Sequence, residues 1–172
     1  MDAKERRTLL LEKLKTAKQP LTGTCLAKEL GVSRQVIVTD FAILRAAGHV
    51  IYATPQGYLL PLIESSKSLK ATLACKHDQD GLEEELSIIV DNGGRVLDVI
   101  VEHSFYGELK ANLMLGSRRE IGEFLHKLED TKAEQLSSIT GGVHLHTIEV
   151  PNEEVLSKIK KELKSKGILM LS

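Results

Sequence analysis

The chain has 172 residues, of which 42% are hydrophobic and 27% are charged. These ordinary globular values exclude a disordered, collagen-like or coiled-coil chain, and the length excludes a large multidomain enzyme. Apolar runs are only a few residues long, whereas a membrane span needs about 20. The charged N-terminus is followed by no apolar segment, so we expect a cytoplasmic protein without a secretory signal or a membrane partner.

Charge is unevenly distributed along the chain, although the formal net charge is only -1. Residues 1–60 carry nine Lys and Arg against five Asp and Glu, whereas residues 61–172 carry fourteen against nineteen. A basic module joined to an acidic remainder is typical of a protein in which one domain meets a polyanion. The two cysteines, Cys25 and Cys75, form no CxxC pair, so we expect reduced thiols rather than a disulfide scaffold or a cysteine zinc site.

Three helices and a hairpin are predicted in the first sixty residues. Apolar residues recur at helical spacing, and Asp2, Thr22 or Thr24, and Ser33 stand where N-caps are needed. A turn with Pro and Gly at residues 54–57 separates two short β-prone runs and predicts a small wing. The predicted helices span residues 2–16, 24–30 and 34–47, and the predicted strands span residues 50–53 and 58–60.

The short turn at residues 31–33 between two amphipathic helices is typical of a helix-turn-helix, whose second helix enters the DNA major groove by its N-terminal end. Arginine and glutamine at that end suit guanine and adenine edges. A protein-binding winged helix is the alternative, because fold does not fix function. The residues expected at DNA are Ser33, Arg34, Gln35, Thr39 and Arg45, with Arg6, Arg7 and Lys28 as further candidates for phosphate contacts.

A second domain is predicted to begin near residue 64, which gives domains of residues 1–63 and 64–172. Strands and helices alternate in the order βαββαβαβ, which predicts an α/β two-layer sandwich with a mainly antiparallel sheet and helices on one face. The whole chain is therefore of the α+β class. The predicted strands span residues 69–76, 95–102, 107–115, 143–150 and 168–171, and the predicted helices span residues 81–90, 117–128 and 152–166.

Three histidines and one glutamate of this domain are candidate metal ligands. His144 and His146 lie two apart on a predicted strand, so both rings emerge from one face. His77 ends the first strand of the domain, and Glu85 falls within the apolar arc of the next helix, where an unpaired charge is costly. This donor set suits one divalent nickel, zinc or iron ion per chain. His49 and His126 fit exposed positions.

Recognisable motifs occur in both domains, at residues 32–40, 44–48, 56–58, 74–77, 101–103, 106–107 and 141–147. They resemble those of NiaR, the nicotinate-responsive repressor family, which joins a winged helix to a regulatory domain with three histidines. The resemblance implies that His77, Glu85, His144 and His146 hold a divalent metal, and that nicotinic acid is a corepressor for NAD biosynthesis or niacin uptake genes. His103 and Tyr106 are candidates for binding this effector, although His103 suits a structural role equally well.

Two other functions compete with an effector-controlled repressor. In the first, the metal ion itself is the signal. In the second, the histidines and the carboxylate activate water in an enzyme, but no nucleophile motif, HExxH sequence or phosphate loop accompanies them, so we predict no catalytic residues. A homodimer is expected because one helix-turn-helix offers few base contacts, and two-fold symmetry lets two of them read an operator in double-stranded DNA.

Overall fold

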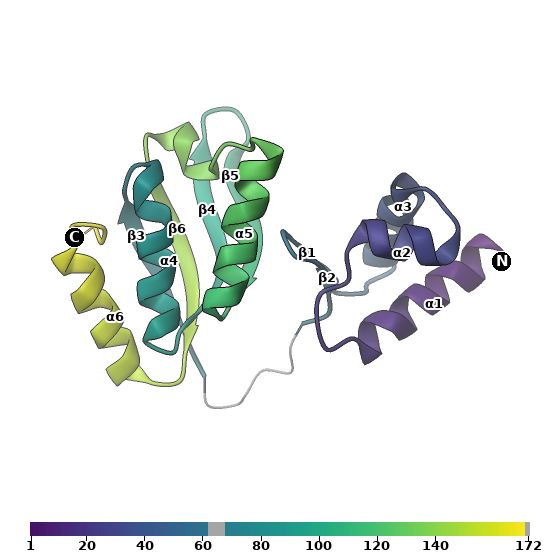
Figure 1. Ribbon diagram of the computed structural model, residues 1–172, viewed down its shortest axis with the longest axis horizontal. Helices are drawn as coiled ribbons and strands as arrows, with labels where there is room; N and C mark the ends of the chain where they lie inside the picture. Colours follow the sequence, from purple (N-terminus) through teal and green to yellow (C-terminus); the bar gives the residue numbers. More distant parts are fainter. Residues whose placement is uncertain (62–67, 171–172) are drawn as a thin grey trace. The chain divides into compact units, whose positions relative to one another are not determined.

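The computed structural model describes residues 1–61 and 68–170, and the chain divides into two compact units, Met1–Glu64 and Ser65–Ser172. The predicted domain boundary at residues 63 and 64 lies outside the described residues. Each unit is therefore described by itself (Figure 1). Within residues 1–61 and 68–170, no helix combines the length and the apolar composition that crossing a membrane requires.

The first unit contains the three predicted helices and the predicted caps. Asp2, Thr22 and Ser33 each accept a hydrogen bond from a backbone N–H in the first turn, which satisfies donors that have no partner inside the helix. Gly31 ends the second helix at φ 65°, a left-handed conformation that glycine adopts without strain. The helices are α1 (Ala3–Thr16), α2 (Gly23–Leu30) and α3 (Arg34–Ala46).

The wing is an antiparallel pair, β1 (Tyr52–Thr54) and β2 (Gly57–Leu59). The first strand is shorter than predicted and begins later, because Val50 is exposed and the chain enters the core only at Ile51. The second strand keeps its predicted length but begins one residue earlier, at Gly57. The backbone of Leu21 pairs with Tyr58, which attaches the wing to the segment before α2.

One core holds the first unit together, and it includes a buried ion pair that the sequence did not predict. Ile37, Phe41 and Leu44 of α3 are buried as predicted, whereas Val36 and Val38 are only half-buried. Asp40 is also buried, and Arg6 and Arg7 of α1 pair with it at 2.6 and 3.3 Å. These two arginines, predicted to contact phosphates, instead join α1 to α3.

The second unit is the predicted two-layer sandwich. Its antiparallel sheet has the strand order β3-β6-β4-β5, and the three helices lie on one face (Figure 1). The strands are β3 (Leu69–Lys76), β4 (Arg95–His103), β5 (Gly107–Leu115) and β6 (Val143–Val150); the helices are α4 (Leu82–Asp91), α5 (Arg118–Thr131) and α6 (Glu153–Ser165).

Three features of this unit differ from the prediction. A 3-10 turn, η1 (Gln79–Gly81), precedes α4, and a second one, η2 (Leu136–Thr140), precedes β6. The predicted last strand is reduced to an isolated bridge between Leu169 and Cys75, and Leu171 lies outside the described residues. The sheet bulges between Val96 and Asp98.

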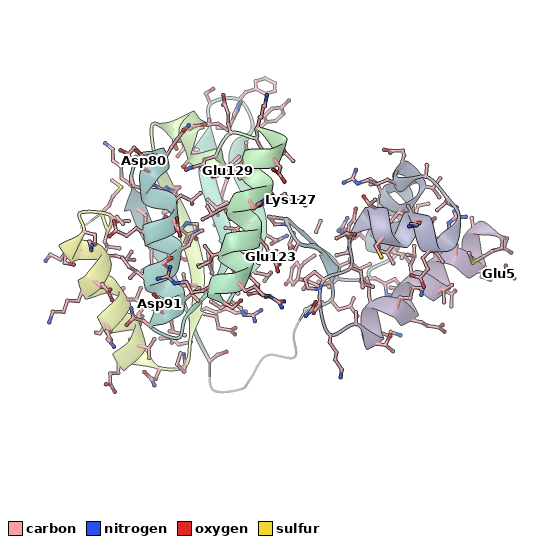
Figure 2. All side chains as sticks on the ribbon, in the orientation of Figure 1. Glu5, Asp80, Asp91, Glu123, Lys127 and Glu129 are labelled. Atoms are coloured by element: carbon pink, nitrogen blue, oxygen red, sulfur yellow. The ribbon has the colours of Figure 1, made fainter. Side chains whose placement is uncertain are left out.

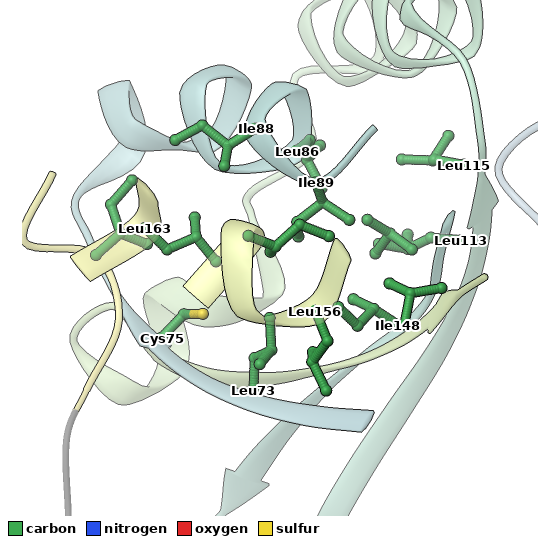
Figure 3. Packing of buried hydrophobic residues seen from close by; sticks show 14 of the residues in the cluster. Leu73, Cys75, Leu86, Ile88, Ile89, Leu113, Leu115, Ile148, Leu156 and Leu163 are labelled. Atoms are coloured by element: carbon green, nitrogen blue, oxygen red, sulfur yellow. The ribbon is translucent and has the colours of Figure 1, made fainter. Parts of the chain in front are cut away.

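An apolar core fills the space between the sheet and the helices (Figure 3). Leu73 and Cys75 of β3 and Ile148 of β6 face this layer, together with Leu86 of α4 and Leu163 of α6. The alternation along β6 therefore directs His144 and His146 into the same layer, because they share the parity of Ile148. Two imidazoles thus face the apolar side of the sheet.

Candidate metal centre and DNA-binding helix

The four predicted metal ligands come from three elements of the second unit. His77 directly follows β3, Glu85 lies in the first turns of α4, and His144 and His146 lie on β6. Strands β3 and β6 are neighbours, and α4 covers them. The side chains of these four residues are at most 5% exposed, so the cluster is secluded from solvent.

All three imidazoles converge on one carboxylate oxygen. The distances to Glu85 Oε2 are 2.6 Å from His77 Nε2, 3.0 Å from His144 Nε2 and 3.4 Å from His146 Nε2. Rings of neighbouring histidines meet edge to face, with centroids 4.9 and 4.8 Å apart. The structure therefore brings together the four residues that the sequence singled out.

The other nitrogen of each ring faces a backbone carbonyl. His77 Nδ1 lies 2.5 Å from the carbonyl oxygen of Asp78. His144 Nδ1 lies 2.8 Å from that of Gly142, and His146 Nδ1 lies 2.7 Å from that of Asp98. A carbonyl oxygen only accepts hydrogen bonds, so each Nδ1 carries a proton. In a neutral ring, Nε2 is then left with a lone pair directed at Glu85, which is the arrangement found in histidine metal ligands.

His146 Nε2 is a buried atom without a hydrogen-bond partner among the described residues, because its approach to Glu85 lacks hydrogen-bond geometry. Neutral imidazoles present lone pairs to a carboxylate that can only accept, so the cluster lacks positive charge at its centre. Protons on Nε2 or a metal ion can supply that charge. A buried polar atom left unpaired would otherwise cost free energy.

The electrostatics of the cluster follow from its burial and its composition. Burial raises the pKa of Glu85, but the three histidines outweigh it and hold that pKa well below its usual value. Burial likewise lowers the pKa values of His77 and His146, and the carboxylate of Glu85 outweighs it, so that both are raised overall. Without a metal ion, the site therefore retains protons on histidine.

Cys75 is a neighbour of the cluster that sequence reasoning missed. It is paired in register with His144, and ligand-capable atoms of Cys75, Glu85 and His144 all lie within 4.8 Å of one another. Burial and the negative charge of Glu85 raise the pKa of the Cys75 thiol. It therefore stays protonated at neutral pH and is a weaker metal ligand than the imidazoles. Only the pairing of β3 with β6 could have revealed this contact.

The predicted effector residues lie together at the tip of the β4–β5 hairpin. His103 Nδ1 accepts hydrogen bonds from the N–H groups of Phe105 and Tyr106, and the rings of His103 and Tyr106 are 5.1 Å apart. A cavity of about 540 Å³ instead adjoins the cluster at His77, on the side of η1 and η2. Its lining includes Gln135, Ser137, Ser138 and Gly142.

The predicted DNA-reading residues all belong to α3 and its N-cap. Ser33 accepts a hydrogen bond from Val36 N–H and caps α3, and Arg34, Gln35 and Thr39 are exposed in its first two turns. Arg45 lies farther along, where its Nε donates to the carbonyl of Ile51 at 2.8 Å and its guanidinium lies 5.7 Å from the ring centroid of Tyr58. Arg45 therefore supports the wing, whereas Arg34 and Gln35 project from the helix start.

Comparisons with known proteins agree with this organisation. An HTH domain model matches residues 6–59, and a 3H domain model matches residues 70–172. The chain is 46% identical to the probable transcription repressor NiaR of Thermotoga maritima, over 96% of this chain and 94% of that protein. It is 43% identical to the transcription repressor NadR of Bacillus subtilis, over 96% of this chain and 93% of that protein.

The matches cover both units and confirm the resemblance predicted from the sequence motifs. Both relatives are named as transcription repressors, which agrees with the prediction that the chain is not an enzyme. The helix-turn-helix at residues 6–59 likewise supports binding to DNA. The chain therefore belongs to the family of the NiaR and NadR transcription repressors.

Proposed function

We propose that this protein is a cytoplasmic transcription repressor that binds an operator in double-stranded DNA, with nicotinic acid as its corepressor and one divalent transition-metal ion per chain. The names of the relatives support repression, and the family resemblance supports control of NAD biosynthesis or niacin uptake genes. The observation that carries the metal site is the convergence of three imidazole Nε2 atoms on the buried Glu85 carboxylate.

The residues fit a borderline divalent ion. A cation bound by His77, His144, His146 and Glu85 would occupy the Nε2 lone pairs, give His146 Nε2 a partner and neutralise the buried carboxylate. Imidazole and carboxylate ligands suit nickel, zinc and iron alike. The ion would supply a buried positive charge that favours an anionic effector nearby.

The first unit supports readout of DNA by α3. Arg34 and Gln35 are exposed at the start of this helix, where a helix-turn-helix meets base edges, and Ser33 and Thr39 flank them. Arg45 lies beside the wing, and we propose that it contacts the phosphate backbone from there. Two copies related by a two-fold axis would read half-sites about one helical turn apart, so we propose a homodimer.

The cavity beside His77 supports the effector assignment. Its volume of about 540 Å³ accommodates a small aromatic acid, and the hydroxyl and amide groups of Ser137, Ser138 and Gln135 can hydrogen-bond a carboxylate or a ring nitrogen. Because His77 lines this cavity and also faces Glu85, effector binding and metal binding share a residue. We therefore propose that the effector binds at this cavity and requires the metal ion.

Calorimetric titration of nicotinic acid into the metal-loaded, chelator-treated and His146→Ala proteins tests these proposals together. We expect micromolar binding only to the metal-loaded protein, and a bound-metal content lowered by His146→Ala. The matched control is His126→Ala, because His126 is exposed on α5 and pairs only with Asp130. Binding that survives chelation would contradict the metal-dependent cavity, and an unchanged metal content would reject His146 as a ligand.

An absence of nicotinic acid binding in every sample would contradict the effector assignment. It would favour the alternative in which the metal ion is itself the signal, and operator affinity should then change with metal concentration near cellular levels. The burial of all four ligands favours a resident cofactor over such a sensor, because a secluded ion exchanges slowly. Turnover of nicotinic acid would instead indicate an enzyme.

A further inference from the structure

We infer that the uncovered face of the four-stranded sheet packs against the same face of a second copy of this chain, about a two-fold axis parallel to the strands. This inference rests on the proposed dimeric repressor. It assigns the surface that joins the two copies, which neither the family matches nor the metal site identifies.

Only one face of the sheet is covered by helices in the part of the chain that the structure describes. Helices α4, α5 and α6 all pack on the side that carries Leu73, Ile148 and the histidines (Figures 1 and 3). The opposite side has an apolar centre, because Leu145 is paired in register with both Ala74 and Ile100. These three side chains are half-buried by their neighbours, and they form a row across three strands.

Charged side chains surround this apolar row in an ordered pattern. Exposed Lys76 stands on β3 at one edge of the sheet, and exposed Glu108 stands on β5 at the other edge, near the same end. Toward the other end, Arg95 of β4 and Glu149 of β6 face each other in register. At the Lys76 end, the face is therefore positive at the β3 edge and negative at the β5 edge. Exposed Lys110 of β5 also lies on this face, beside Ile100, and its charge is paired with Asp98 of β4 at 2.8 Å.

A two-fold axis along the strands makes this pattern complementary to itself. Such an axis places β5 of the second copy over β3 of the first, and β4 over β6. Lys76 then faces Glu108 of the second copy, and Glu149 faces Arg95 of the second copy. Leu145 faces Ile100 of the second copy at the centre, where apolar side chains meet. Lys110 of the second copy lies over Ala74, so its aliphatic stem covers that end of the row.

An axis across the strands fits the charges less well. It would turn the sheet end to end and place the Lys76 end of β3 over the Lys70 end of β3 in the second copy, so that like charges meet at that edge. The charge pattern thus selects the axis parallel to the strands. That arrangement is the aligned packing of two sheets, whose cores are about 10 Å thick.

The size of the face is sufficient for a specific dimer. Four strands about 4.8 Å apart and about eight residues long cover roughly 19 by 26 Å, or about 500 Å² on each copy. Two such faces bury about 1,000 Å², which is the lower limit for a stable interface. The occupant is therefore a second copy, and coverage by the first unit of the same chain becomes an outcome of the test.

Complementary charge reversals test the interface in the full-length, metal-loaded protein. Lys76→Glu and Glu108→Lys each create two repulsive pairs in a homodimer, so we expect each variant to dimerise at least about tenfold more weakly than the wild type at low salt. An equimolar mixture of the two variants has only attractive pairs at these positions. We therefore expect the mixture to form heterodimers with near wild-type affinity, measured by sedimentation equilibrium and native mass spectrometry.

Rescue by mixing identifies an intermolecular contact, because Lys76 and Glu108 are three strand spacings, about 14 Å, apart within one chain. The matched controls, Glu129→Lys and Lys160→Glu, reverse charges on exposed positions of α5 and α6 (Glu129 is labelled in Figure 2) and should dimerise like the wild type. Variants that remain dimeric, or a mixture that does not recover, would overturn this interface while leaving a dimeric repressor intact. A monomeric wild type would overturn both and would leave the first unit as the remaining candidate to cover the face.

Discussion

Glu85 sets the chemistry of the second unit at the scale of single residues. It is fully buried on a helix whose neighbouring inward residues, Leu86 and Ile89, are apolar. A buried carboxylate without positive charge beside it would be strongly destabilising. Three imidazoles face it, and each ring is oriented by a backbone carbonyl at Nδ1. The cluster is therefore built for a positive charge, carried either by protons or by an ion.

Opposite pH responses are expected for metal-free and metal-loaded protein. The raised pKa values of His77 and His146 stabilise the metal-free fold fully below about pH 6.5, the value of an unperturbed histidine, and this contribution is lost as pH rises through the folded pKa values. The lowered pKa of Glu85 also stabilises the fold. This stabilisation is fully present above the unfolded pKa near 4.5 and is lost as pH falls through the folded pKa. Metal-free protein should therefore lose stability as pH rises from 6.5.

Metal affinity should rise over the same pH range, because protons compete with the ion for Nε2. Urea unfolding between pH 5.5 and 8.5, with chelator and with nickel, measures both effects. A metal-free protein whose free energy of unfolding increases above pH 6.5 would contradict the assignment of the histidine protons.

Sequence reasoning oriented those residues whose direction follows from a local period of the chain. His144 and His146 follow from strand alternation, and Glu85 follows from helical periodicity. Cys75 and Asp40 were missed, because their environments depend on partners far away in the chain: Cys75 meets His144 through the pairing of β3 with β6, and Asp40 meets Arg6 across two helices. Periodicity carries no information about such contacts.

At the scale of elements, the turn from η2 into β6 positions the metal cluster. Gly142 has φ 93°, and a Cβ there would overlap the carbonyl oxygen of His77. The carbonyl of Gly142 also accepts the Nδ1 proton of His144. This turn therefore holds two of the three histidines in place.

Gly142→Ala should lower metal affinity by at least about tenfold, because the added methyl group displaces His77 and the strained backbone shifts the carbonyl that orients His144. Gly141→Ala is the matched control, since Gly141 also has a positive φ, of 62°, but no atom lies within 4 Å of its Cβ position. It should cost about 1 kcal/mol of stability and leave the metal affinity nearly unchanged. Competition with a chromogenic chelator measures the affinities, and equal losses in both variants would contradict this role.

Different residues of helix α3 are expected to serve DNA readout and stability. Arg34→Ala should lower affinity for a cognate operator by about 1–3 kcal/mol and relax base preference, without changing stability. Asp40→Ala should destabilise the first unit by about 1–3 kcal/mol, because it removes the buried partner of Arg6 and Arg7. Operator binding by fluorescence anisotropy and urea unfolding distinguish the two effects. A uniform loss for Arg34→Ala on all DNA sequences would assign this residue to phosphate contacts.

Elements with a clear period and a cap were predicted to within a few residues. Strands β3, β5 and β6 have the predicted bounds, and Ser117 and Asn152 cap α5 and α6. The 3-10 turn η2 was not predicted, because its sequence has neither a helical nor an alternating pattern. The last strand was predicted from local β propensity, but among its described residues, 168–170, only Leu169 bridges to β3, at the edge of the sheet.

At the scale of the whole molecule, the proposed repressor requires that its two units respond to each other. Metal and effector belong to the second unit and operator contacts to the first, so control of transcription is a coupling free energy between separate sites. Dimerisation through the sheet face would bring two recognition helices to one operator. The effector must then bind the conformation of the dimer that binds DNA with a different affinity from the conformations that do not.

Reciprocity gives the most stringent test of this coupling. If nicotinic acid is a corepressor, it should increase the affinity of metal-loaded protein for its operator, typically by about 5–150-fold, and the operator should increase the affinity for nicotinic acid by the same factor. An operator selected from a random duplex pool, titrated with and without nicotinic acid, measures the first factor; calorimetry with and without the operator measures the second. Because linkage makes the two factors equal at equilibrium, unequal values would indicate that nicotinic acid acts on a species other than the operator-bound dimer. A decrease in operator affinity would instead make nicotinic acid an inducer and reverse the sign of the proposed control.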